Sequence, residues 1–269
     1  MNNVRSLVSV NQTNTLVFHF SEPTLTCSSL VTNQITYFTI EIPDILQIVP
    51  LYTSNIIFIR TTNSFIVWCL DKGTEIKKII MSGIQDICVS RKYIALCTSH
   101  EIQLIYTSSL QPFQTFCLDY PYLKGTSALD HYENRTIFVY SAKKGECTIC
   151  RENKMATVKV CNAIVTSIFV DSKNDLLVVV CSKEIMLFKL SSLQMVRKVL
   201  NSLLSVDVCS FSSTMCFCSN GCGKTLCIGL NPTSKVFFID HRSGYYLYSQ
   251  NLLYNVDASG RVLRRILVE

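Results

Sequence analysis

Long apolar runs and linker-like stretches are missing from this chain of 269 residues. No apolar run approaches the ~20 residues that a membrane-spanning helix needs, and the longest, LLVVVC at 176–181, has the length of a strand. The first residues lack the basic segment and apolar stretch of a signal peptide, so we expect the protein to stay in the cytosol. Gly (9 residues) and Pro (6 residues) are scarce, which argues against flexible linkers and favours one domain over 1–269.

Charged residues are also few, at 16% against 48% hydrophobic residues. Packed sheets bury strands on both faces and need few charges, whereas an amphipathic helical bundle would carry more Lys and Glu. Sustained helical periodicity is absent. Short apolar runs rich in Val, Ile, Phe, Tyr and Thr recur instead, separated by turns of Asn, Asp, Ser, Lys and Gly. This pattern predicts an all-β fold.

The stronger signal is an internal repeat. The segment TSHEIQLIYTSSLQ at 98–111 and the segment CSKEIMLFKLSSLQ at 181–194 are identical at 8 of 14 positions, with an offset of 83 residues. That offset is about two propeller blades of ~40 to 45 residues each. One four-stranded blade cannot bury both faces alone, whereas blades stacked around an axis cover one another. We therefore predict a WD-repeat-like β-propeller.

Seven blades fit the chain, although six blades plus a partial one would also fit. We expect a strand from one terminus, within 4–10 or 262–268, to complete a blade of the other terminus. The last region is compressed and its strand pairing is left open. The predicted blades cover 1–41, 42–81, 82–118, 119–161, 162–200, 201–229 and 230–269.

Several of these strands, taken in order, resemble a known family. The segments are SFIVW at 64–68, KII at 78–80, RKYIAL at 91–96, EIQLIY at 101–106 and SLQPFQTF at 109–116. They resemble the corresponding part of the PROPPINs, the WD-repeat phosphoinositide-binding propellers of autophagy. Residues 162–199 are similar to the fifth blade of that family, and SGYYLY at 243–248 to the aromatic strand of its last blade. The resemblance implies a propeller that binds phosphatidylinositol 3-phosphate-like membranes and recruits autophagy proteins.

The family's sharpest motif is Phe/Leu-Arg-Arg-Gly at the end of the fifth blade, where the two arginines point to opposite sides and each serves one lipid headgroup site. The matching residues here are Val196, Arg197, Lys198 and Val199. The resemblance therefore implies Arg197 and Lys198 as the lipid-binding residues. Lys offers a point charge where Arg offers two parallel donors, and Val199 removes the freedom of a glycine at a turn. The family's long membrane loop in the sixth blade has no room here between about Cys222 and Val236.

Patterns that could carry catalysis are better explained as structure. The segment NGCGKT at 220–225 ends like a P-loop, but the required Gly, five positions before the Gly of Gly-Lys-Thr, is replaced by Cys218, and strands follow. We expect a Gly-rich hairpin turn there. No histidine pair and no Gly-x-Ser-x-Gly elbow is present, and we expect Asp86 and Asp207 to bond to backbone near inner strands. We therefore predict a protein that is not an enzyme and has no cofactor.

The 14 cysteines are expected to be buried free thiols, because most lie inside apolar strands and no export signal is present. Cys147 and Cys150 have metal-ligand spacing, but residues three apart on a strand point to opposite faces. A second pair from Cys216, Cys218 or Cys222 has no evident reason to meet them. We predict no metal site.

The net charge of +6 suits an anionic partner, and no run of Lys and Arg with interleaved aromatics points to nucleic acid. Two functions stay open. The first is a lipid-recruited propeller, cytoplasmic and peripherally on membranes, that binds an anionic phosphoinositide membrane surface and other autophagy proteins. The second is a WD-repeat protein-interaction scaffold that has lost lipid binding. We expect a monomer in both cases.

Overall fold

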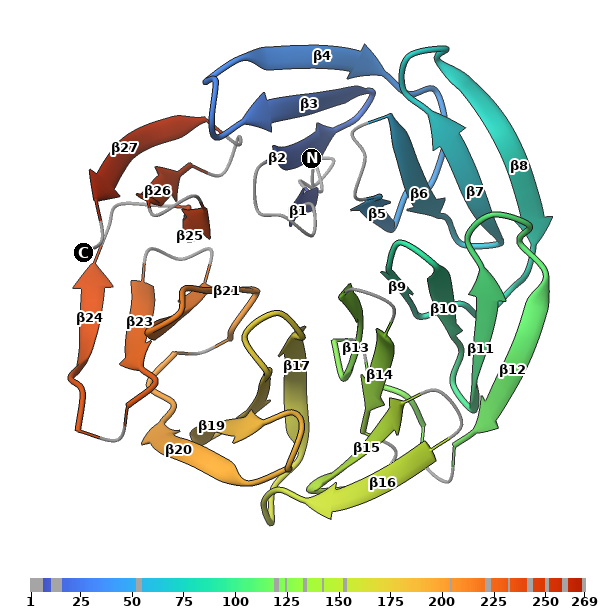
Figure 1. The fold of residues 1–269 in the computed structure, drawn as a ribbon. Helices are drawn as coiled ribbons and strands as arrows, with labels where there is room; N and C mark the ends of the chain where they lie inside the picture. The colour runs from blue at the N-terminus through green and yellow to red at the C-terminus, as the bar shows by residue number, and fades with distance from the viewer. Residues whose placement is uncertain are drawn as a thin grey trace. The chain divides into compact units, whose positions relative to one another are not determined.

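The computed structural model contains 27 strands in seven sheets, and no helix occurs among the residues it describes (Figure 1). None of those residues forms a helix long and apolar enough to cross a membrane. The described residues are 7–10, 16–51, 55–118, 121–123, 125–132, 135–141, 143–151, 154–203, 205–220, 224–231, 233–240, 244–249, 252–257 and 261–267.

The chain divides into two compact units. The first comprises 1–84, 221–225 and 240–269, and the second comprises 85–220 and 226–239. The prediction of a single domain over 1–269 therefore stays a prediction.

The first unit holds three sheets. Their strands are β1 (Leu7–Val10), β2 (Leu16–Ser21), β3 (Thr24–Ser29) and β4 (Ile35–Thr39); β5 (Gln47–Pro50), β6 (Ile56–Arg60), β7 (Ser64–Cys69) and β8 (Thr74–Ile80); and β25 (Tyr245–Ser249), β26 (Leu252–Val256) and β27 (Val262–Leu267).

The second unit holds four sheets, apart from the ends of β23 and β24. Their strands are β9 (Asp86–Val89), β10 (Tyr93–Cys97), β11 (Glu101–Tyr106) and β12 (Pro112–Cys117); β13 (Ser127–Tyr132), β14 (Arg135–Tyr140), β15 (Glu146–Arg151) and β16 (Lys154–Lys159); β17 (Val165–Asp171), β18 (Leu176–Cys181), β19 (Glu184–Lys189) and β20 (Met195–Leu200); and β21 (Val208–Phe211), β22 (Met215–Asn220), β23 (Lys224–Gly229) and β24 (Val236–Asp240).

Within each sheet the strands lie side by side in chain order, as antiparallel meanders where the register is defined (Figure 1). The middle strands are apolar at successive positions because both of their faces are covered; β18, the LLVVVC segment, is buried at every residue. The last strand of a sheet carries charges and is mostly exposed, as β8 and β20 show. Residues on these edge strands are therefore the ones available to solvent.

Each unit has its own apolar core between neighbouring sheets. In the first unit, side chains from β2 to β7 form one cluster that includes Phe18, Leu25, Ile57 and Ile66. In the second unit, three clusters fill the spaces between successive sheets, and the fifth sheet contributes to two of them, with Leu177 in one and Val178 in the next. Adjacent residues of one strand thus serve two cores, which explains the near-continuous apolar runs of the sequence.

The internal repeat is confirmed in the backbone. Leu110 and Leu193, at equivalent positions of the two SSLQ segments, both have positive φ, of 57° and 58°. Each donates its N–H to the carbonyl four residues earlier, at 2.8 Å. The same two sheets carry a β-bulge at the same repeat position, after Leu104 and after Leu187. Equal sequence has therefore produced equal turn and bulge geometry.

The predicted blade limits agree with the sheets for the first five blades, but the sixth was wrong. Strand β24 belongs with β21 to β23, so the sixth sheet reaches Asp240 and not residue 229. The error arose because the turn after Gly229 closes within six residues, with the Gly229 N–H donating to the Lys235 carbonyl at 3.3 Å. The last sheet accordingly has three strands in the described part of the chain.

The expected exchange of a terminal strand was also wrong for the strands that the structure describes. Strand β1 pairs with β2 and β27 pairs with β26, so each terminal strand bonds to its own neighbour in sequence. A hairpin neighbour is the entropically cheaper partner, because it closes a shorter loop.

Candidate functional site

Arg197 and Lys198, the two residues predicted to bind a lipid headgroup, lie on β20, the edge strand of the fifth sheet. Arg197 pairs with Leu187 of β19, and Lys198 pairs with Met186. Successive side chains of a strand point to opposite faces, so these two cations leave the sheet in opposite directions.

The Arg197 guanidinium is bound by the protein's own backbone. Its Nη1 donates to the carbonyl oxygens of Gly229 at 2.6 Å and Asn231 at 2.9 Å, and its Nη2 donates to that of Ser234 at 2.7 Å. The three carbonyls belong to the turn between β23 and β24. Three of the guanidinium's five N–H donors are thus used to hold that turn against the fifth sheet.

Lys198 is bound more weakly. Its Nζ lies 2.6 Å from Oε1 of Glu184 on the neighbouring strand β19, and the two side chains are 49% and 29% exposed. Ion pairs of this exposure contribute about 0–1 kcal/mol, because water screens the charges. The Lys198 ammonium could therefore exchange its partner at low cost, whereas Arg197 could not.

The structure shows the setting of two differences between this chain and the family, which are Val199 in the motif and the short connection in the sixth sheet. Val199 continues β20 and pairs with Ile185, so its position is strand and not the turn at which a glycine would be needed. The connection between β23 and β24 spans only residues 230–235. The expected lack of room for a long loop in the sixth sheet therefore agrees with the structure.

The P-loop-like segment lies between two strands, as a hairpin turn requires. Its first residue, Asn220, ends β22, and Lys224 begins β23, the next strand of the same sheet. Residues 221–223 lie outside the described residues. No helix follows, so the strand–loop–helix setting of a phosphate-binding P-loop is not present.

Asp86 anchors a buried polar network in the second unit that sequence reasoning foresaw only in part. Its Oδ2 accepts hydrogen bonds from the Tyr122 hydroxyl and the Gly125 N–H, both at 2.9 Å. The Tyr122 hydroxyl also lies 2.6 Å from Oγ of Ser127, and burial raises the pKa of Tyr122 well above its usual range. The bond to Gly125 is the predicted bond to backbone. The network joins two sheets and is structural, because all of these polar atoms are satisfied by one another.

Cys147 and Cys150 point to opposite faces of the fourth sheet, as predicted from their spacing. Cys147 packs in the core shared with the fifth sheet, and Cys150 in the core shared with the third. Burial raises the pKa of each thiol to about 12. The pair cannot converge on one ion, and Cys222, considered as a partner for it, lies outside the described residues.

A different set of thiols does converge, and the sequence pattern did not reveal it. The Sγ atoms of Cys209, Cys216 and Cys218 all lie within 4.8 Å of one another. Hydrogen bonds with the thiols of Cys209 and Cys216 lower the pKa of Cys218 to about 5, whereas burial raises the pKa of Cys209 well above its usual range. The spacing of Cys216 and Cys218 could have indicated that their side chains lie on the same face, because residues two apart on a strand share a face. That Cys209 joins them could be known only from the register between β21 and β22.

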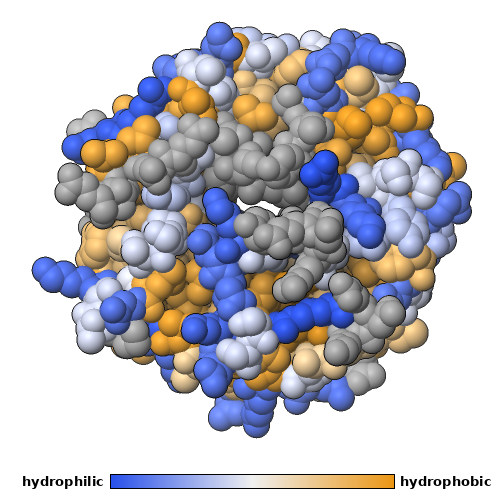
Figure 2. Space-filling model, in the orientation of Figure 1, coloured by the Kyte–Doolittle hydropathy of each residue, from blue (hydrophilic) through white to orange (hydrophobic). Residues whose placement is uncertain are grey.

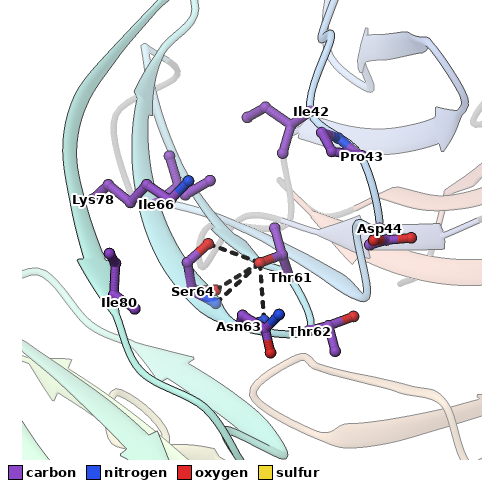
Figure 3. A pocket seen from close by; sticks show the side chains of 10 residues that line it. All are labelled: Ile42, Pro43, Asp44, Thr61, Thr62, Asn63, Ser64, Ile66, Lys78 and Ile80. Atoms are coloured by element: carbon purple, nitrogen blue, oxygen red, sulfur yellow. Dashed lines mark hydrogen bonds between the residues drawn. The ribbon is translucent and has the colours of Figure 1, made fainter.

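A depression of about 280 Å³ opens on the first unit beside β8 (Figure 3). Thr61 and Ser64 hold one wall rigidly, since the Thr61 Oγ1 accepts the Ser64 N–H at 3.0 Å and lies 2.7 Å from the Ser64 Oγ. At the rim, Ile80 is 85% exposed. The lining residues are Ile42, Pro43, Asp44, Thr61, Thr62, Asn63, Ser64, Ile66, Lys78 and Ile80.

Other edge strands also expose large apolar side chains. Met195 and Leu200 on β20 are examples, as are Phe237 and Phe238 on β24. On the face drawn in Figure 2, apolar residues reach the surface in several separate patches with hydrophilic residues between them. Scattered apolar residues are ordinary on a protein surface. Ile80 is the more informative candidate for a binding residue, because this exposed side chain also borders a depression.

No family model and no curated protein sequence matches this chain. Solved structures do match it in fold. Hsv2 of Kluyveromyces marxianus, a PROPPIN, has a TM-score of 0.75 at 13% identity, over 98% of this chain and 100% of that chain. Hsv2 of Kluyveromyces lactis with its complete loop 6CD has a TM-score of 0.72 at 13% identity, over 98% and 100%. A chain of the mitotic checkpoint complex has a TM-score of 0.73 at 11% identity, over 97% and 86%.

These similarities concern the fold. The seven sheets are the blades of a seven-bladed β-propeller, as predicted, and the predicted resemblance to the PROPPINs is confirmed at the level of the fold.

Proposed function

We propose that this chain is a non-catalytic propeller that binds a protein partner through the depression beside β8. The observation that carries the proposal is Ile80, a large apolar side chain that is 85% exposed at the rim of a pocket. Burying such a side chain against a partner contributes about 1.5–3 kcal/mol. A protein chain in the mitotic checkpoint complex shares this fold, which supports a role in protein assemblies.

The lining of the depression suggests the chemistry of the partner. Ile42, Pro43 and Ile80 offer apolar contacts, while Lys78 is exposed beside them on the edge strand (Figure 3). An extended segment with an apolar side chain and a neighbouring carboxylate would satisfy both features, because the carboxylate would pair with the Lys78 ammonium. The rigid Thr61–Ser64 turn keeps the pocket open before binding, which reduces the ordering cost.

Position-specific cross-linking tests this proposal. A photo-reactive residue placed at Ile80 should form a discrete adduct with one protein in extracts of the source cells, and Lys78→Glu in the same chain should weaken it at least about tenfold. The matched control is the same residue at Met155, which is 56% exposed on another edge strand. Equal labelling at both positions, or none at Ile80 in folded protein, would contradict the proposal.

A second candidate function is headgroup binding at Arg197 and Lys198, with the protein cytoplasmic and peripherally associated with phosphoinositide membranes, where it would recruit autophagy proteins. The observation that favours it is that these two cations leave β20 on opposite faces, as the resemblance to the PROPPINs implies. Against it, Arg197 donates to three carbonyls of its own chain, and only residues 230–235 stand where the resemblance would place the family's long sixth-blade loop.

Glu184 makes the second candidate testable. Co-sedimentation with phosphatidylinositol 3-phosphate liposomes should increase for Glu184→Gln, because the substitution releases the Lys198 ammonium, and it should fall for Lys198→Ala. Identical, salt-insensitive behaviour of wild type, Glu184→Gln and Lys198→Ala would exclude this site and leave the protein-binding function.

A further inference from the structure

Three thiols of the sixth sheet meet on one face. Cys209 on β21 lies directly opposite Cys218 on β22, and Cys216 precedes Cys218 by two residues on the same strand. Residues directly opposite in a ladder, and residues two apart on a strand, share a face. The Sγ separations are 3.3 Å for Cys209–Cys216, 3.7 Å for Cys209–Cys218 and 3.6 Å for Cys216–Cys218.

These separations suit a shared ion. A disulfide needs sulfurs about 2.05 Å apart, and one bond would leave the third thiol unpaired. Four sulfurs held tetrahedrally at about 2.3 Å from Zn²⁺ lie about 3.8 Å from one another. The three observed separations fall short of that value by about 0.1–0.5 Å, which small side-chain rotations would supply.

The surroundings favour a soft ion. Cys216 and Cys218 are fully buried, and they pack in a core with Val178, Leu187 and Leu226. Apolar side chains surround these thiols, whereas Ca²⁺ and Mg²⁺ sites are built from oxygen ligands. Thiolate sulfur selects soft and borderline ions such as Zn²⁺. Cys209 packs at the edge of this core and is the least buried of the three residues.

Ordinary burial of free cysteines explains the other thiols better than it explains these. Cys150 is buried in an apolar strand, as small hydrophobic side chains often are, and Cys147 packs in one core with Cys181 and the partly buried Cys161. Among the residues that the structure describes, only Cys209, Cys216 and Cys218 form a group of three potential ligands. A metal site requires several ligand atoms that converge on one point, as these three sulfur atoms do. Apolar packing does not require its thiols to converge.

We propose that Cys209, Cys216 and Cys218 bind one Zn²⁺ as thiolates, with the fourth ligand supplied from outside this group of three. The ion would tie β21 to β22 and so stabilise the sheet whose turn Arg197 holds. The site is independent of the proposed partner surface, which lies in the first unit.

Cobalt substitution tests the site directly. The full chain, reduced and freed of metal, is titrated with Co²⁺, whose thiolate charge-transfer and tetrahedral ligand-field absorption report the ligands. Wild-type protein should develop these bands up to one Co²⁺ per chain and lose them when Zn²⁺ is added. Cys216→Ser and Cys218→Ser should each abolish the tight, stoichiometric binding.

The matched control is Cys181→Ser, because the Sγ of Cys181 lies 2.9 Å from that of Cys161 and forms a pair without a third ligand. This variant should keep the full bands. Loss of the bands in Cys181→Ser but not in Cys218→Ser would overturn the assignment, as would the absence of bands in folded wild-type protein. A rise of the unfolding midpoint with Zn²⁺ in wild type and Cys181→Ser, absent in Cys216→Ala, provides a second measurement should a serine variant fold poorly.

Discussion

The role of Arg197 makes a sharp prediction, because its side chain has two incompatible uses. If the guanidinium holds the turn between β23 and β24, Arg197→Ala should destabilise the protein in the absence of any lipid. If it were held free for a headgroup, the same substitution should leave stability unchanged. The three carbonyl acceptors, of Gly229, Asn231 and Ser234, decide between these two uses.

The size of the effect follows from the bonds. A hydrogen bond from a charged donor contributes about 1.5–3 kcal/mol when its acceptor is buried, and less when water can replace the donor. Two of the three bonds are partly buried and one is exposed. We therefore expect Arg197→Ala to cost about 2–3 kcal/mol. For a protein of 269 residues the unfolding midpoint should fall by about 4–5 °C.

Thermal and denaturant unfolding measure this change. Arg197→Lys should recover about half of the loss, since one ammonium cannot reproduce the planar fork that reaches three acceptors. Lys198→Ala is the matched control on the adjacent position, and should cost only about 0–1 kcal/mol because its ion pair is exposed. An Arg197→Ala midpoint within about 1 °C of wild type would refute the reasoning and return Arg197 to the headgroup site.

Three further predictions concern other parts of the fold. Gly229→Ala should destabilise the protein by about 1–3 kcal/mol in denaturant unfolding, because the added Cβ would overlap the Ser234 Cβ. A second change, Ser234→Gly, should restore part of the lost stability. A single variant as stable as wild type would contradict the tight turn. Asp86→Asn should cost about 2–3 kcal/mol, because an amide nitrogen cannot accept the hydrogen bonds that Oδ2 of Asp86 receives; an unchanged midpoint would show that the network is dispensable. Burial lowers the pKa of His19 below its usual 6.5, opposed by the nearby Asp257 charge. The folded state therefore binds this proton less readily than the unfolded chain, so stability should fall as pH drops through about 6.5, and His19→Gln should flatten that slope; identical pH profiles for the two proteins would be the opposing result.

The propeller architecture was predictable because it is local and repeated. The pattern of short apolar runs and polar turns identifies strands, and the repeat at an offset of 83 residues identifies their grouping. The end of the sixth blade was predicted wrongly. Its edge strand β24 begins with the apolar segment VFF at 236–238 and follows a short turn, so the local pattern does not separate this strand from the next blade.

The candidate sites were predictable only in part. Arg197 and Lys198 were placed correctly on an edge strand, but the acceptors of Arg197 lie 32 to 37 residues further along the chain. No spacing rule connects an arginine to carbonyls at that distance. The depression beside Ile80 likewise joins three segments of the first unit and has no signature in any one of them.

The sequence by itself determined the all-β class, the repeat of the blades and the opposite orientations of Cys147 and Cys150, because strand periodicity and turn chemistry act over a few residues. Only the tertiary structure decided which donors meet which acceptors: that the guanidinium of Arg197 is taken by a turn of the next blade, and that Cys209 joins Cys216 and Cys218. These contacts between residues far apart in the sequence depend on strand register and blade packing. Register and packing are set by many weak contacts summed over the fold, and not by the few residues that come into contact.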